Sequence, residues 1–231
     1  MICQLAREGA NDRLSEARIL YSSIKSIELV DDAPQPVTPM SLTLRGLIYV
    51  SLYGAIEYTV TQGVQQFIVH LCGLNVQTAH LEQALYSIAL DSQLKSAREG
   101  SEKNKWTARR EIFSSQFSSS LCDIPDTVFG SYLHNVYPKT VLEIFQCLGI
   151  VRPATQHPSE VGYFREITEK RNAVAHGRES ASNAGRSLSL NELEIRLNAV
   201  YSICSYFLDV LEEQALNLGF VKADHRASYA S

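Results

Sequence analysis

Residues 46–69 contain a single charged side chain, Glu57, and this stretch constrains the fold most. Thr38 and Pro39 precede it as an N-cap and a proline at the first helical position, which predicts one helix over Met40–Cys72. A membrane span is the alternative, but it needs about 20 predominantly apolar residues. Six polar side chains interrupt this stretch: Ser51, Thr59, Thr61, Gln62, Gln65 and Gln66. We therefore expect a central helix that is buried on most sides.

Glu57 falls on one stripe of this helix together with four large residues: Tyr53, Val60, Val64 and Phe67. Burying a lone carboxylate costs free energy unless a partner compensates its charge. We therefore expect Glu57 to lie among core residues and to have a partner.

Apolar residues that recur every three or four positions predict the other helices. The expected helices span residues 11–30, 76–98, 140–148, 159–176 and 189–218. Capping boxes at Thr140–Glu143 and Ser189–Glu192 mark two of the helix starts. The expected breaks, turns and loops are residues 31–39, 73–75, 151–158 and 179–187.

The last predicted helix carries an apolar seam with heptad-like spacing: Leu193, Leu197, Val200, Cys204, Phe207 and Leu211. Such a seam packs inside a bundle or against a partner helix. Residues 99–138 are less regular, and we expect short helices and loops there, as an insertion, and a flexible tail over 220–231. Because no strand pattern competes, the predicted fold class is all-α. We expect a helical bundle of four to six main helices in a single domain, residues 1–231.

The chain has 231 residues, a net charge of −4 and five cysteines. The cysteines are scattered and form no C-x-x-C, which predicts free thiols in a reducing cytosol. The first residues lack the order of a signal peptide, so we expect a cytoplasmic protein without a membrane segment. Histidines, cysteines and carboxylates show no metal-ligand spacing, and no phosphate-binding glycine motif occurs. We therefore expect neither a metal nor a cofactor.

A local basic segment interrupts the acidic composition between residues 95 and 111. It has a net charge of +3, and its basic residues are Lys95, Arg98, Lys103, Lys105, Arg109 and Arg110. Such a segment can guide an RNA backbone. A solvated face of mixed charge is the commoner explanation, and the overall charge of −4 is not typical of a nucleic-acid binder.

The stretch that is most informative about chemistry is Arg171–Gly177, with the sequence RNAVAHG. The spacing Arg-x4-His is weak evidence alone, because Arg152–His157 has it too. That copy contains Pro153 and precedes Pro158, so it cannot be helical. The copy at Arg171–Gly177 ends an amphipathic helix, and its glycine is a natural residue after a helix end.

Helical spacing predicts where these side chains point. Asn172 and His176 are four residues apart and share a face, so the amide can hold one imidazole nitrogen. Arg171 lies on the apolar stripe of its helix and needs a carboxylate, for which Glu57 is the natural candidate. At a helix end, the dipole favours the protonated imidazole of His176.

A histidine that exchanges protons near neutral pH, beside an arginine, suits proton transfer at a phosphodiester. The guanidinium would stabilise charge on the phosphoryl oxygens. A structural alternative stays open, in which Arg171 and Glu57 form an ion pair and His176 caps the helix by donating to a carbonyl.

The stretch Arg171–Gly177 resembles the signature of the HEPN superfamily, in which an arginine, a polar residue, three further positions and a histidine end a helix of a small bundle. Leu44–Leu47 and Tyr53–Glu57 resemble the early helix of MAE-type and RiboL-PSP-type members, with its aromatic and acidic pair. The resemblance covers about residues 10–215, and residues 99–138 match least.

This resemblance implies a metal-independent endoribonuclease. Such enzymes cut RNA by attack of the 2′-hydroxyl and leave a cyclic phosphate, with arginine and histidine from two subunits meeting in a cleft. Carried over, Arg171 and His176 are catalytic, Asn172 is supporting and Glu57 orients. Many members are toxins or antiviral factors, so the expected partners are RNA, a second copy and an antitoxin or defence-system protein. We expect the helix seams to form the dimer interface.

One departure concerns regulation. Toxins silenced by a partner nucleotidyltransferase carry a tyrosine two positions after the histidine, where this chain has Arg178, so that regulation is not supported. The alternative function is a non-catalytic HEPN module that binds nucleotide, RNA or a protein, with Arg171 and His176 buried or capped. The third possibility, a plain helical interaction protein, is supported by no specific feature of the sequence.

Overall fold

The computed structural model describes residues 1–31 and 33–230. The helices of ten residues or more are α1 (Gln4–Glu28), α2 (Pro39–Gly73), α5 (Glu102–Ser114), α6 (Pro138–Cys147), α7 (Glu160–Ala175) and α9 (Leu190–Leu216). The shorter helices are α3 (Tyr86–Ala89), α4 (Asp91–Glu99) and α8 (Ala181–Gly185). The 3₁₀ turns are η1 (Thr78–His80), η2 (Gln83–Leu85), η3 (Ser115–Phe117), η4 (Tyr132–His134) and η5 (Ala223–Ser228). A small hairpin pairs β1 (Leu29–Val30) with β2 (Ala33–Pro34). The predicted all-α class with four to six main helices is confirmed.

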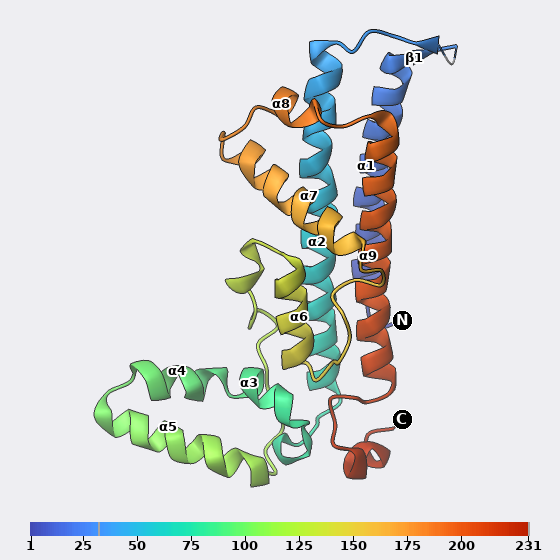
Figure 1. Ribbon diagram of the computed structural model, residues 1–231. Coiled ribbons are helices and arrows are strands. Elements are labelled where there is room, and N and C mark those ends of the chain that lie inside the picture. Colours follow the sequence, from blue (N-terminus) through green and yellow to red (C-terminus); the bar gives the residue numbers. More distant parts are fainter. Residues whose placement is uncertain (32, 231) are drawn as a thin grey trace.

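Helix α2 is the centre of the bundle, as its sequence predicts. Helices α1, α2 and α9 run side by side, and α6, α7 and α8 lie along one side of α2 (Figure 1). The helix begins where the sequence indicates, because Thr38 Oγ1 accepts a hydrogen bond of 3.1 Å from the N–H of Ser41. Across residues 1–31 and 33–230, none of the helices combines the length and the apolar character that a bilayer crossing requires.

The seam of α9 is used inside the chain. All six predicted seam residues are buried, and the ring of Phe207 stacks on that of Phe145 of α6, with ring centroids 5.4 Å apart. The prediction of a bundle seam is confirmed. The expectation that this seam forms a dimer interface is wrong, because its apolar surface is already covered by the chain's own helices.

Residues 179–187 contain α8, so the prediction of a plain loop there is wrong. Its N-cap is Ser180, whose hydroxyl accepts from the N–H of Asn183 at 3.2 Å. The helix lies directly against α2, and glycines make this approach possible: a Cβ on Gly46 would be 1.8 Å from the carbonyl oxygen of Ala181, and one on Gly185 would be 2.1 Å from the carbonyl oxygen of Leu42. The small residues that suggest a loop in the sequence are needed for helix contact in the fold.

This contact gives a testable prediction for stability. Gly46→Ala is expected to destabilise the protein by about 3 kcal/mol, because the new methyl group meets backbone that has to move. Gly54 lies in the same helix with nothing within 4 Å of its added Cβ. Gly54→Ala is the matched control and is expected to stabilise by about 0.5–1 kcal/mol, the helix propensity difference. Urea unfolding of both variants measures the two effects. Equal free energies of unfolding would contradict the close contact.

Residues 76–98 form no single helix, contrary to the prediction. Their backbone is instead bonded to distant parts of the chain. The carbonyl of Val76 accepts from the N–H of Cys122 at 2.7 Å, and the N–H of Glu82 donates to the carbonyl of Phe220 at 2.9 Å. These pairings use backbone N–H and carbonyl groups that one continuous helix would need. The segment therefore forms the shorter elements η1, η2, α3 and α4.

The same pairings hold the C-terminal segment, so the predicted flexible tail over 220–231 is wrong for the residues up to 230. Phe220 is fully buried and packs edge-on against Phe67, with ring centroids 5.7 Å apart. In η5, the ring of His225 stacks on His80 at 3.7 Å, and Tyr229 lies 2.8 Å from the same imidazole. Ser231 at the end of the tail, and Asp32 in the predicted break, lie outside the described residues.

Residues 99–138 hold helix α5, 13 residues long, followed by turns and loops. The predicted capping box at Thr140 is wrong, because α6 begins two residues earlier at Pro138 and Thr140 Oγ1 instead accepts from the N–H of Tyr137 at 3.1 Å.

Helices α4 and α5 with η3 project from the lower end of the bundle (Figure 1). We call this unit, residues 91–117, the arm.

Candidate active site at the end of α7

Helix α7 ends in a turn that leaves one imidazole in solvent. His176 is the C-cap, Gly177 has a positive φ of 67°, and the N–H of Arg178 donates to the carbonyl of Ala173 at 2.8 Å. Together these form a Schellman motif, as the glycine predicts. The imidazole of His176 is exposed and makes no hydrogen bond within residues 1–31 and 33–230. Its backbone caps the helix, whereas its side chain has no structural task.

Arg171 points the other way, against α2. Its Nη2 lies 3.3 Å from each carboxylate oxygen of Glu57, and its Cζ lies 3.7 Å above the ring of Tyr53. The Arg171–Glu57 partnership predicted from the two helical stripes is therefore present. The Arg171 side chain is 17% exposed and that of Glu57 34%. Glu57 is thus half-buried, and its predicted place among core residues is wrong: it lines an open pocket of about 370 Å³.

Tyr53 fixes the carboxylate that holds Arg171. Its hydroxyl donates to Glu57 at 3.2 Å and accepts from the N–H of Val136 at 3.0 Å. Burial and the nearby charge of Glu57 raise the pKa of Tyr53 to about 12, so the hydroxyl keeps its proton and remains a donor. The guanidinium therefore sits in a preformed frame.

Asn172 belongs to this frame and does not hold the imidazole, so that prediction is wrong. Its Oδ1 accepts from Arg171 Nη1 at 2.7 Å, and its Nδ2 donates to the hydroxyl of Tyr137 at 3.5 Å. Only its backbone carbonyl meets His176, accepting the N–H at 3.1 Å. The amide is buried and turns toward its nearest donor, the guanidinium of the preceding residue, while the imidazole turns to solvent.

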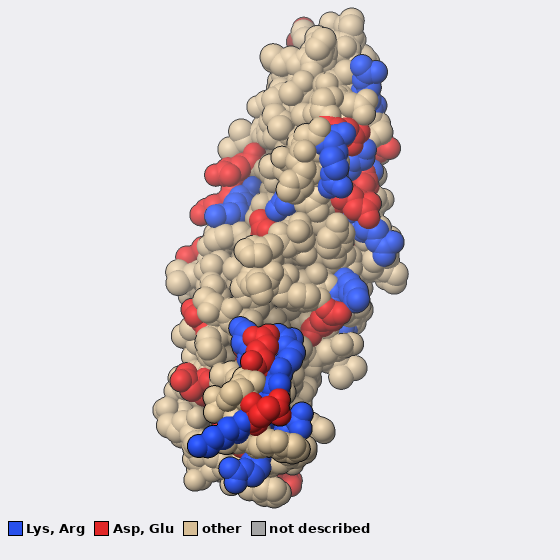
Figure 2. Space-filling view, turned by 90° about the vertical axis from the view of Figure 1, so that its left-hand side faces the viewer, with Lys and Arg blue, Asp and Glu red and all other residues tan. Residues whose placement is uncertain are grey.

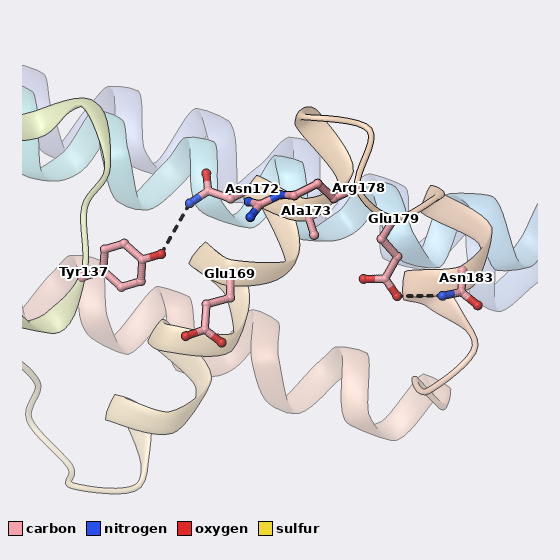
Figure 3. Close-up of a pocket in the computed structure, with 7 residues that line it drawn as sticks. All are labelled: Tyr137, Glu169, Asn172, Ala173, Arg178, Glu179 and Asn183. Carbon is pink, nitrogen blue, oxygen red and sulfur yellow. Dashed lines mark hydrogen bonds between the residues drawn. The ribbon is translucent and has the colours of Figure 1, made fainter.

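A polar pocket of about 480 Å³ opens beside Asn172 (Figure 3). It is lined by Tyr137, Glu169, Asn172, Ala173, Arg178, Glu179 and Asn183. Glu179 is held by Lys170 at 3.0 Å and by Asn183 at 2.9 Å. The sequence does not predict this pocket. It marks Arg178 only as a departure from a family tyrosine, and Tyr137, just before α6, comes from another part of the chain.

A second network fixes α7 on its two neighbours. Glu166 accepts from the hydroxyl of Tyr49 on α2 at 2.6 Å and pairs with Arg196 on α9 at 2.9 Å. Burial, and next the hydrogen bond to Glu166, raise the pKa of Tyr49, so it stays a donor. The end of α7 therefore projects from a rigidly held helix.

The predicted RNA-binding residues are not part of this site within one chain. Lys95 and Arg98 are on α4, and the remaining four, Lys103, Lys105, Arg109 and Arg110, are on α5. The arm lies toward the lower end of the bundle, away from α8 and the end of α7 (Figure 1). The structure thus brings together Arg171, Asn172 and Glu57, with His176 on the adjoining turn. In the described ranges, no group of three histidine, cysteine or acidic residues is arranged to hold a metal ion.

The fold and the site together define a class of protein. It is a helical bundle in which one helix ends in a histidine and carries an arginine that is anchored on the central helix. The chain matches the family model RiboL-PSP-HEPN over residues 10–213 and belongs to this HEPN-type family. The predicted membership of the HEPN superfamily is thereby confirmed. Membership indicates a nuclease-like or RNA-related module and is compatible with ribonuclease activity. No curated protein and no solved structure matches the chain.

Proposed function

We propose that the protein is a metal-independent endoribonuclease of the HEPN type, acting in the cytoplasm as a toxin or an antiviral defence effector. The observation that supports this most is the contrast between His176 and Arg171. The imidazole is exposed and makes no hydrogen bond within the described residues, while the guanidinium five residues earlier on α7 is held by three groups in a defined orientation. Phosphodiester cleavage requires both an oriented positive charge and a group that is free to transfer a proton.

In the proposed reaction, the 2′-hydroxyl oxygen bonds to the adjacent phosphorus and the bond from phosphorus to the 5′-oxygen breaks. The imidazole of His176 accepts the 2′-hydroxyl proton and then, as the protonated imidazole, supplies a proton to the leaving 5′-oxygen. Arg171 stabilises charge on the non-bridging oxygens; its Nε–H makes no hydrogen bond within the described part of the chain. Glu57 and Asn172 hold the guanidinium, and the products are a 2′,3′-cyclic phosphate and a 5′-hydroxyl.

Helix geometry supports a site shared between two copies. Arg171 and His176 are five residues apart and point about 140° from each other around the axis of α7. One chain therefore presents them on different sides, whereas two copies meeting at the ends of α7 provide two imidazoles and two guanidinium groups. A homodimer, RNA and a neutralising antitoxin or defence partner are the partners we propose.

Cleavage in EDTA tests the proposed activity. The purified protein, incubated with RNA and excess EDTA, is expected to cut internally and to leave 2′,3′-cyclic phosphate ends. RNA with 2′-O-methyl groups is the matched control substrate and is expected to resist, because the attacking hydroxyl is blocked. Cleavage that needs added divalent metal, or that cuts the methylated RNA, contradicts the mechanism.

Mixing two inactive variants tests the shared site. Arg171→Gln and His176→Ala each remove one group, so each homodimer is expected to be inactive. If arginine and histidine come from different copies, one site of the mixed dimer is complete and activity returns on mixing. A mixture as inactive as its components contradicts the shared site, provided that subunits exchange, which differently tagged copies measure.

The alternative function is a non-catalytic HEPN module that binds nucleotide, RNA or a protein partner. Two observations favour it: Arg171 is 17% exposed, and the polar pocket beside Asn172 is not lined by His176. This alternative predicts RNA or nucleotide binding without any cleavage. Calorimetric titration with nucleotides, alongside the cleavage assay, separates the two functions.

A further inference from the structure

The outer face of the arm carries aromatic side chains that the fold leaves in solvent. Trp106 is 62% exposed, Phe113 73% and Phe117 86%. Seven residues make nearly two helical turns, so Trp106 and Phe113 point within about 20° of each other on α5. Ala108, the buried residue of this helix, lies about 160° from Trp106. The aromatic face therefore points away from α4, the helix against which α5 packs.

Cationic side chains flank this aromatic face. Arg109, Arg110 and Lys103 lie within about 60° of Trp106 around the axis of α5. The guanidinium of Arg109 is 4.8 Å from the ring of Trp106. Figure 2 shows Lys and Arg side chains gathered on the lower part of the face toward which the arm projects, with acidic side chains among them.

The acidic side chains do not neutralise this face. Arg98 pairs with Glu99 at 2.6 Å, and Lys105 pairs with Glu102 at 3.1 Å. Within residues 1–31 and 33–230, the other four basic residues of the segment have no acidic partner: Lys95, Lys103, Arg109 and Arg110. Unpaired cations that alternate with exposed aromatic rings are complementary to a single-stranded nucleic acid, which offers phosphates and flat base surfaces together.

We propose that the arm is a binding platform for single-stranded RNA, separate from the end of α7. Bases stack on Trp106 and Phe113, which lie about 10 Å apart along the helix axis. Phosphates contact Arg109, Arg110 and Lys103. The choice of RNA as the ligand rests on the proposed function. The arm would hold the RNA strand, while cleavage takes place at the end of α7 of the same chain or of a partner copy.

Binding of a strand that cannot be cleaved tests the platform independently of catalysis. The probe is a fluorescein-labelled 20-nucleotide 2′-O-methyl oligouridine, and fluorescence anisotropy measures its affinity for the full chain. The double variant Trp106→Ala/Phe113→Ala is expected to bind about tenfold or more weakly, since each stacked base contributes to affinity. The double variant Arg109→Gln/Arg110→Gln is expected to reduce the slope of log affinity against log salt by about 1.4, which corresponds to two lost phosphate contacts.

Matched controls lie outside the arm. Tyr201 on α9 is 52% exposed and Arg18 on α1 is exposed. Tyr201→Ala and Arg18→Gln are expected to leave the affinity and the salt slope unchanged. Because all the substituted side chains are exposed, the variants are expected to fold, and thermal unfolding checks this.

Any of the following three results contradicts the proposal that the arm binds RNA. If the arm variants bind as tightly as the wild type, RNA binds elsewhere. If the wild type does not bind the oligonucleotide, the face has another use. If the aromatic variant instead changes the oligomeric state, the face is a contact between copies of the chain. Cleavage of unmodified RNA is scored separately: cutting without arm binding leaves the proposed ribonuclease intact, and arm binding without cutting favours the non-catalytic RNA-binding module.

Discussion

His176→Ala is expected to lower the rate of RNA cleavage by about 10²- to 10⁴-fold, the usual contribution of a general acid–base group, without changing the unfolding temperature. The imidazole is exposed and makes no hydrogen bond within the described residues, so its removal leaves no cavity and no unpaired buried group. The backbone of His176 still caps α7, because alanine keeps the same N–H group and carbonyl. Initial rates on a labelled RNA and a thermal melt measure the two quantities.

The matched control for this variant is His157→Ala. Arg152 and His157 have the same spacing as Arg171 and His176, but they lie in the loop before α7, where Arg152 pairs with Glu213. The control is expected to cleave at the wild-type rate. If both histidine variants cleave as the wild type does, His176 is not catalytic. If His176→Ala loses stability together with activity, the imidazole stabilises the fold through a contact that the structure does not show.

Arg45→Met is expected to destabilise the protein by about 3–5 kcal/mol, because it leaves a buried carboxylate without its counter-ion. Glu28 and Arg45 are 5% and 7% exposed, and Arg45 Nε donates to Glu28 at 2.7 Å. Arg45 also donates to the carbonyl of Leu188, and Ser41 donates to Glu28. This ion pair ties the ends of α1 and α2 to the start of α9. Urea unfolding at pH 7 measures the loss.

The control pair is exposed, and a double variant tests the physical reason. Arg152 and Glu213 are each about half exposed, so Arg152→Met is expected to cost about 0–1 kcal/mol. Replacing both partners, Glu28→Met with Arg45→Met, is expected to recover most of the stability, because no buried charge remains. A double variant as unstable as Arg45→Met would mean that packing, not charge, is responsible.

The same pair predicts how stability depends on pH. Burial raises the pKa of Glu28, but the hydrogen bonds from Arg45 and Ser41 outweigh it, so the pKa is lowered from its ordinary value of 4.5. The stability from this group is therefore fully present above pH 4.5 and is lost as the pH falls through the lower folded-state pKa. In Arg45→Met the unpaired carboxyl gains a proton more readily. The difference in unfolding free energy between wild type and variant is thus expected to narrow from pH 7 to pH 4, measured by urea unfolding.

The sequence predicts those features that depend on neighbouring residues. Thr38 caps α2, Ser189 and Glu192 form the capping box of α9, and Gly177 ends α7, all as expected. Each of these is decided by hydrogen bonds within one turn of helix. The helical stripes also predict that Arg171 faces Glu57, because both residues lie on stripes with large apolar residues and a charge there is stabilised by an opposite charge.

Distant contacts decide the features that the sequence does not predict. Residues 76–98 lose their helix to backbone pairs with residues 118–122 and 220–222. Residues 181–185 gain a helix because Gly46 and Gly185 allow close contact with α2. The direction of the Asn172 side chain likewise depends on Tyr137, which comes from another helix.

The sequence alone determined the central helix at 39–73 and the all-α class, because patterns of burial and capping are local, and it also showed the family. The tertiary structure decided how Arg171 and His176 are placed. It anchors Arg171 with Glu57, Asn172 and Tyr53, leaves His176 in solvent, and projects the arm with its exposed aromatic rings. The reason is physical: whether a side chain is held or free depends on which groups from distant segments reach it, and only the folded chain brings those groups together.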